Sequence, residues 1–127
     1  METGRIAFNH GSLAIGELAA AFSAIPADVT FVDADGVVRY FSDYRIFSRP
    51  ESCLGSDVLA CHRLESRPGI AQLFAEFRDG WRDEAVFAAR VNDRPVRIRY
   101  IALRDDDGAY LGCVELAQWA DELGGTV

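Results

Sequence analysis

Cys61 and His62 are the adjacent pair of side chains in this sequence that offers the most chemistry. A cysteine thiolate or a neutral imidazole beside an apolar pocket is a suitable axial ligand for haem iron. Adjacent residues in an irregular segment point in different directions, so we expect only one of them to bind iron. His62 is the first choice and Cys61 the alternative. Haem is therefore the leading specific ligand predicted for this segment.

The contrasting interpretation of the same pair is structural. Free cysteine is commonly buried, and Cys61 then fills core as a small apolar side chain. His62 then caps or hydrogen-bonds the loop that leads into the following helix. This is the more frequent situation for such a pair, so it stands beside the haem hypothesis.

Other chemistry has weaker support. Cys53, Cys61, His62 and Cys113 carry the right atoms for tetrahedral zinc, but no spacing is of the Cys-x-x-Cys type. Cys61 beside His62 is no catalytic dyad, because a nucleophile and its base normally converge from different parts of a fold. A redox sensor based on Cys61 needs that thiol exposed and its pKa depressed. We expect no catalytic activity.

The composition restricts the class of protein. The chain has 127 residues, which suits one domain with a single core. Its net charge of −7 argues against nucleic-acid and anionic-membrane partners. All thirteen basic residues are arginine, which excludes chemistry that depends on lysine, and the three cysteines argue against a disulfide scaffold. The sequence shows neither a leader nor an apolar run of about 20 residues, so we expect a cytoplasmic protein.

A helical segment lies at the centre of the chain. Ile70, Leu73, Phe74 and Phe77 form one apolar stripe at helical period. Pro68 suits the first turn of a helix, and a glycine at position 80 suits its end. We expect any ligand to lie under this helix.

The segments around the central helix predict strands and one more helix. Strands are expected over 29–33, 37–41, 85–91, 95–104 and 109–117, and a short helical piece around 44–47. Residues 1–11 are predicted to be a flexible lead-in, 12–25 an N-terminal helix with Ser12 as its N-cap, and 119–127 a short tail. On the last strand, Gly112, Val114 and Leu116 are expected to share one face. Glu115 is expected to point the other way, toward Arg97 or Arg99.

Several short segments in this order and spacing resemble one known family. They are Phe8-Asn9-His10-Gly11-Ser12-Leu13, Val29-Thr30-Phe31-Val32-Asp33-Ala34-Asp35, Val38-Arg39-Tyr40-Phe41-Ser42, Ile46-Phe47, Gly55, Cys61-His62, Ile98-Arg99-Tyr100 and Tyr110-Leu111-Gly112. With these segments in this order, the chain resembles a PAS domain of the small type found beside DUF438 or hemerythrin-like regions in bacteria. The resemblance implies an α+β fold over 28–118, with a five-stranded antiparallel sheet in the order 2-1-5-4-3 and helices on one face.

The resemblance also implies a sensory role. We expect a cytoplasmic signal-transduction protein that binds a small molecule, with haem as one candidate, and that signals through a homodimer or a separate signalling protein. The alternatives are a ligand-free interaction module and a redox sensor based on Cys61. The predicted pocket-lining residues, besides His62 and Cys61, are Phe31, Phe47, Phe74, Ile98 and Tyr100. Leu18 and Phe22 on the N-terminal helix are predicted either to pack within the chain or to form the dimer interface, and we favour the dimer interface.

Overall fold

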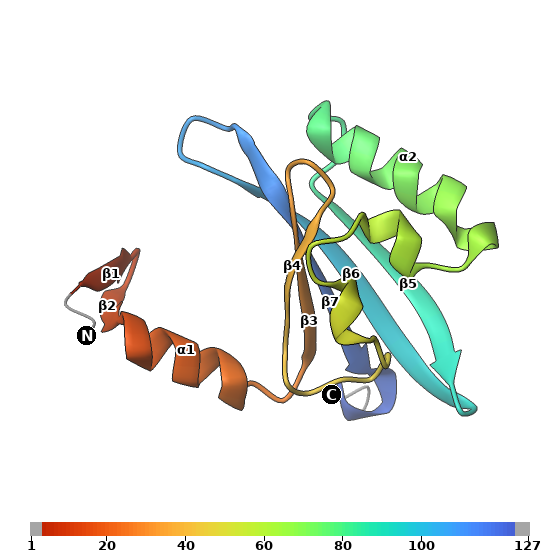
Figure 1. Cartoon of the computed structure of the whole chain (residues 1–127), viewed down its shortest axis with the longest axis horizontal. Coiled ribbons are helices and arrows are strands. Elements are labelled where there is room, and N and C mark those ends of the chain that lie inside the picture. Colours follow the sequence, from red (N-terminus) through yellow and green to blue (C-terminus); the bar gives the residue numbers. More distant parts are fainter. Residues whose placement is uncertain (1–3, 124–127) are drawn as a thin grey trace.

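A five-stranded antiparallel sheet forms the body of the molecule, which we describe for residues 4–123 of a computed structural model (Figure 1). Its strands are β3 (Asp28–Asp33), β4 (Val38–Phe41), β5 (Glu84–Val91), β6 (Arg94–Arg104) and β7 (Tyr110–Trp119). They lie in the order β4-β3-β7-β6-β5, which is the predicted order 2-1-5-4-3. The chain thus returns from one edge hairpin, through the helical segment, to the opposite edge.

Tight turns fix the register of the sheet. Asn92 and Asp93 both have positive φ angles, 51° and 69°. This conformation suits a two-residue hairpin turn between β5 and β6, because its twist matches that of the paired strands. Asp105 caps the turn before β7, since its carboxylate accepts hydrogen bonds from the backbone N–H groups of Asp107 and Ala109, each at 2.9 Å.

The segment between β4 and β5 covers one face of this sheet. It contains three short 3-10 helices, η1 (Glu51–Cys53), η2 (Val58–Cys61) and η3 (Leu64–Ser66), followed by α2 (Arg67–Arg78). The predicted apolar stripe of α2 is confirmed, because Leu73, Phe74 and Phe77 are buried. Ile70 packs against the same core, which also contains Val32, Val38 and Cys113.

The loop before η1 is not helical, contrary to the prediction for residues 44–47. The buried carboxylate of Asp28 accepts hydrogen bonds from the backbone N–H groups of Ile46 and Phe47, each at 2.9 Å. The same carboxylate pairs with the Arg45 guanidinium at 2.8 Å. In a helical turn these N–H groups would point along the helix axis and could not both reach Asp28. The hydrogen bonds to Asp28 on β3 therefore explain why the helix predicted from the local apolar pattern does not form.

The N-terminal part differs from its prediction in two ways. Residues Arg5–Phe8 (β1) and Gly11–Ala14 (β2) form a hairpin where a flexible lead-in was expected. Helix α1 spans Ile15–Ala24, so it begins later than predicted, and Ser12 lies in β2. Its N-cap residue is Ala14, whose N–H donates to the Glu17 carboxylate at 2.8 Å. Residues 1–3 of the predicted lead-in and 124–127 of the predicted tail lie outside the described range.

Helix α1 extends away from the sheet, beside the β3–β4 edge (Figure 1). None of its residues is buried. Its main contact with the sheet is an edge-to-face packing of Phe22 against Tyr40, with ring centroids 5.9 Å apart.

Gly112, Val114 and Leu116 share one face of β7 and Glu115 lies on the other, as predicted, but the face of Glu115 is the one covered by the helices. Cys113, Glu115 and Ala117 are buried on the helical side of the sheet, whereas Val114 and Leu116 are only half-buried. Glu115 is paired with Tyr100 on β6 and with Thr30 on β3, so it shares their face and not that of Arg97 or Arg99. The expected Glu115 contact with these arginines is therefore wrong. An acidic side chain instead enters the core, which creates the polar end of the candidate site.

Within residues 4–123, neither helix is long and apolar enough to cross a membrane.

Candidate functional site

A cavity of about 670 Å³ lies between the sheet and the segment that covers it. Its walls come from β5, β6 and β7 on one side and from the loop before η1, from η2 and from the start of α2 on the other. They consist of Phe47, Ser48, Arg49, Cys61, His62, Arg63, Glu65, Ser66, Gly69, Ile70, Phe87, Ala89, Ile98, Tyr100 and Glu115. Its volume falls in the range of about 300–1,000 Å³ that is usual for small-molecule sites.

Glu115 and Arg49 form the polar end of this cavity. The Glu115 Oε2 atom lies 3.9 Å from Nη2 of Arg49, and both side chains are mostly buried. Arg49 is held in place by its Nη1 atom, which donates to the Cys61 carbonyl at 2.6 Å. Burial raises the pKa of the Glu115 carboxyl, although the charges of Arg49 and His62 act in the opposite direction.

Tyr100 joins the same polar end from the neighbouring strand. It stands directly opposite Glu115 in the β6–β7 ladder, and both side chains line the cavity. Burial is the main reason why the pKa of the Tyr100 hydroxyl is raised, so the phenol stays protonated and acts as a donor. The polar end therefore presents a carboxyl, a phenol and a guanidinium to the cavity.

His62 is oriented by its own loop. It follows η2, and its Nδ1 atom lies 2.9 Å from the Val58 carbonyl oxygen. A carbonyl oxygen only accepts hydrogen bonds, so Nδ1 carries a proton, and in the neutral imidazole the lone pair is on Nε2. This arrangement, an imidazole fixed through Nδ1 by a backbone carbonyl, is typical of histidines that ligate a metal through Nε2.

Apolar side chains form one part of the cavity wall. Ile98 and Phe87 come from the paired strands β6 and β5, and Ile70 comes from α2. The Phe87 ring packs edge-to-face on Tyr100, with centroids 5.7 Å apart, yet 47% of Phe87 is exposed. An aromatic residue left this accessible beside a cavity provides a surface on which a ligand can be buried.

The structure brings most of the predicted site residues together. Cys61, His62, Phe47, Ile98 and Tyr100 all line the cavity. Phe74 does not line it, because its side chain is buried in the core against Phe77 and Tyr100. Phe31 does not line it either, because it alternates with the buried Thr30 and Val32 and belongs to the other face of β3.

Arg49 and Glu115 were missed as site residues. Arg49 lies in a loop whose path depends on the distant Asp28 anchor, so its local sequence carries no signal. Glu115 is the only acidic residue in the strand 110–119, but apolar residues lie on both faces of that strand, so the sequence pattern does not show that it points inward. A carboxylate on the buried face of a strand indicates either a functional site or a buried ion pair.

The zinc hypothesis gains no support in residues 4–123, where no cluster of three or more histidine, cysteine or acidic side chains is placed to hold a metal ion. Cys113 is fully buried in the main core cluster. It does not belong to the cavity wall that contains Cys61 and His62.

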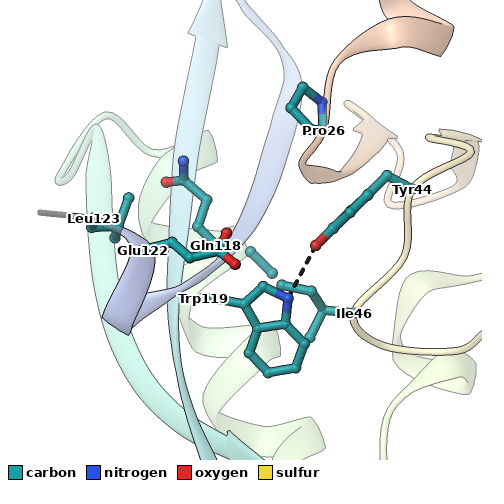
Figure 2. A pocket seen from close by; sticks show the side chains of 8 residues that line it. Pro26, Tyr44, Ile46, Gln118, Trp119, Glu122 and Leu123 are labelled. Carbon is teal, nitrogen blue, oxygen red and sulfur yellow. Dashed lines mark hydrogen bonds between the residues drawn. The ribbon is translucent and has the colours of Figure 1, made fainter.

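A second, smaller pocket of about 90 Å³ lies at the far end of β7 (Figure 2). Trp119 and Tyr44 form its wall, and the indole N–H donates to the Tyr44 hydroxyl at 3.0 Å. Arg94 stacks on the Trp119 ring at 4.0 Å and pairs with Asp121. This pocket is well below the size of a usual ligand site, so we interpret it as part of the packing that fixes the end of β7.

Comparison with known proteins agrees with the fold. A PAS domain family model matches residues 18–118, which is most of the chain. The chain belongs to the PAS domain family. No curated protein matches it.

Solved structures of other PAS domains have the same fold as this chain. The C-terminal domain of a protein from Streptococcus mutans is 25% identical, with a TM-score of 0.84 and 94% of each chain covered. A PAS domain from Colwellia psychrerythraea is 14% identical, with a TM-score of 0.60, covering 83% of this chain and 95% of that one. A sensory box sensor histidine kinase from Vibrio cholerae is 13% identical, with a TM-score of 0.57, covering 79% and 86%. PAS domains are commonly sensory or interaction modules rather than catalysts.

Proposed function

We propose that this PAS domain is a non-catalytic sensor that binds a small molecule in the 670 Å³ cavity. The observation that carries the proposal is a cavity that combines an apolar wall, which includes Phe87, Ile98 and Ile70, with the buried polar end formed by Glu115, Tyr100 and Arg49. Ligand sites usually combine an apolar wall with a few convergent polar groups. A ligand-free interaction module would not need such a space, because its interior would be filled by side chains.

The lining predicts the kind of ligand. The wall of Phe87, Ile98 and Ile70 suits an apolar body, because burying it removes apolar surface from water. The polar end offers both donors and an acceptor, so it suits one neutral or charged polar group. We therefore propose an amphipathic organic molecule whose polar group lies at Glu115.

Haem is the second candidate, and one observation favours it. The His62 imidazole is already fixed through Nδ1, which leaves Nε2 as a potential iron ligand. Haem would then supply a redox-active or gas-binding iron. An intense absorption band near ~400 nm in the purified protein, lost on His62→Ala, supports haem. A colourless protein that takes up no added haem rules this candidate out.

Signalling is proposed to involve a homodimer through α1. The helix is largely apolar, with Glu17 as its acidic residue, and none of its positions is buried. A helix of ten residues is marginal in water without a packing partner. Half-buried Leu18 and exposed Phe22 lie one turn apart, so a second copy of α1 can cover both.

A thermal-shift screen of small amphipathic compounds tests the ligand proposal. Ala89 lines the cavity on β5, so Ala89→Trp fills it, whereas the neighbouring Ala88 is exposed and belongs to the other strand face. We expect compounds that raise the melting temperature of the wild type and of Ala88→Trp but not that of Ala89→Trp. Compounds that stabilise all three proteins equally would place binding elsewhere and contradict the proposal.

A further inference from the structure

Two of the three cysteines lie at the ends of the 3-10 helices η1 and η2, which contact each other beside the cavity. Cys53 ends η1 and is buried, and Cys61 ends η2 and is partly exposed on the cavity wall. The side chain of Ser56 contacts both residues. Both are free thiols, so this pair is a dithiol.

Ser56 holds the Cys61 thiol close to Cys53. Its hydroxyl donates to the Cys53 carbonyl at 2.7 Å and also lies 3.6 Å from the Cys61 Sγ atom. A serine hydroxyl has one proton, which the carbonyl takes, so the Cys61 thiol donates to the Ser56 oxygen. Ser56 thus links the Cys61 sulfur to the backbone of Cys53.

The surroundings of the two thiols give them different chemistry. Burial raises the pKa of the Cys53 thiol, so this residue is a poor first target for an oxidant. Cys61 is reached from the cavity and has Arg49 bound to its own backbone carbonyl at 2.6 Å. An accessible cysteine next to a buried partner is the arrangement of a reactive thiol with its resolving thiol.

We propose that Cys53 and Cys61 form a reversible disulfide when a peroxide enters the cavity. The Cys61 thiolate attacks one peroxide oxygen, the O–O bond breaks, and water leaves after protonation. The Cys61 sulfenic acid that results is attacked by the Cys53 sulfur, so that the S–S bond forms, the S–O bond breaks and a second water leaves. In total, two thiols lose two electrons and two protons to one peroxide, and a dithiol reductant reverses the reaction.

The disulfide ties η1 to η2 and shifts a residue of the cavity wall. Both 3-10 helices lie in the segment that covers the sheet, and Arg49 links the Cys61 backbone to the polar end of the cavity. Oxidation therefore changes the wall at the position from which Arg49 reaches Glu115. This device operates whether or not the cavity also binds a small molecule.

Hydrogen peroxide treatment of the full chain tests the proposal. After alkylation of the remaining thiols, intact mass and peptide mapping are expected to show loss of about 2 Da and a Cys53–Cys61 cross-link, both reversed by dithiothreitol. Cys113→Ser is the control and is expected to form the same cross-link, since Cys113 is fully buried elsewhere.

Two variants complete the test. In Cys53→Ser, the reaction with peroxide is expected to end at the Cys61 sulfenic acid or its further oxidation products, without a cross-link. In Cys61→Ser, Cys53 is expected to remain reduced. The proposal is overturned if wild-type Cys61 is oxidised to the sulfinic acid while Cys53 remains fully alkylatable. It is also overturned if peroxide yields only links between chains or links to Cys113.

Discussion

The carboxylate of Glu115 on β7 lies 3.9 Å from the guanidinium of Arg49, which comes from the loop that crosses the sheet. The two residues are far apart in sequence, and the cavity opens beside the point where they meet. Tyr100 stands opposite Glu115 in the β6–β7 ladder, so the strands and the loop meet at one buried polar site. A ligand that competes for Glu115 or Arg49 therefore acts on both layers of the domain at once.

Glu115 gives a prediction for the pH dependence of stability. Burial raises its pKa in the folded state above the ordinary value of 4.5, so the folded protein retains a proton that the unfolded chain has released. In the pH range above 4.5 and up to the folded-state pKa, the free energy of unfolding therefore falls as pH rises, by at most about 1.4 kcal/mol per pH unit. Glu115→Gln removes this fall. Urea unfolding at a series of pH values measures it, and parallel profiles for the two proteins would refute the assignment.

Asp28 gives a prediction for the loop that carries Arg49. Its carboxylate is 2% exposed and binds Arg45 together with two backbone N–H groups. Asp28→Asn leaves the Arg45 charge without its partner, so we expect a loss of roughly 3–5 kcal/mol in the free energy of unfolding. Denaturant titration measures this. Arg39→Ala breaks the exposed pair with Asp33 and serves as the control, with an expected cost of about 0–1 kcal/mol. If the two changes lowered the free energy of unfolding equally, Asp28 would not be what holds this loop in place.

Gly112 tests the close approach of β7 to β3. It has a φ angle of 141°, and an added Cβ would lie 2.2 Å from the Val32 carbonyl oxygen. Because that oxygen belongs to the backbone of a paired strand, Gly112→Ala is expected to cost about 3 kcal/mol or more.

Gly69 in α2 provides the matched control for Gly112. An added Cβ there meets nothing within 4 Å, and the residue is helical. Gly69→Ala is expected to stabilise the protein by about 0.5–1 kcal/mol. The melting temperatures of both variants measure these effects. A Gly112→Ala variant with the wild-type melting temperature would show that the strands do not approach this closely.

Helix α1 gives a prediction for assembly. Phe22→Glu places a charge on the proposed dimer surface, whereas Ser23→Glu adds the same charge at the next exposed position. We expect sedimentation to show a dimer for the wild type and Ser23→Glu and a monomer for Phe22→Glu. A wild-type protein that stays monomeric over the micromolar range, or a dimer that Phe22→Glu leaves intact, would contradict the assignment.

The sequence predicted the helical stripe of α2 and the positions of the five sheet strands, because their periodicity and turn residues are local signals. The resemblance to PAS domains added the order of the sheet. Cys61 and His62 were correctly placed at the cavity, because they stand just before the helix that covers it.

What the sequence did not predict depends on long-range contacts. Strand β7 carries apolar residues on both faces, so its pattern does not show that Glu115 points inward. Phe31 was assigned to the pocket by residue type, although Thr30 is the residue buried on that side. The Arg49 position follows from the Asp28 anchor, which joins residues distant in sequence and leaves no periodic signal.

An NMR titration of the isotope-labelled protein with the best compound from the thermal-shift screen tests the central claim most directly. The account predicts that backbone amide shifts change at Glu115, Tyr100, Ile98 and His62, and that the same compound leaves the spectrum of Ala89→Trp unchanged. Shift changes confined to α1 or to the outer face of the sheet, or the same changes in Ala89→Trp, would contradict a ligand site in this cavity.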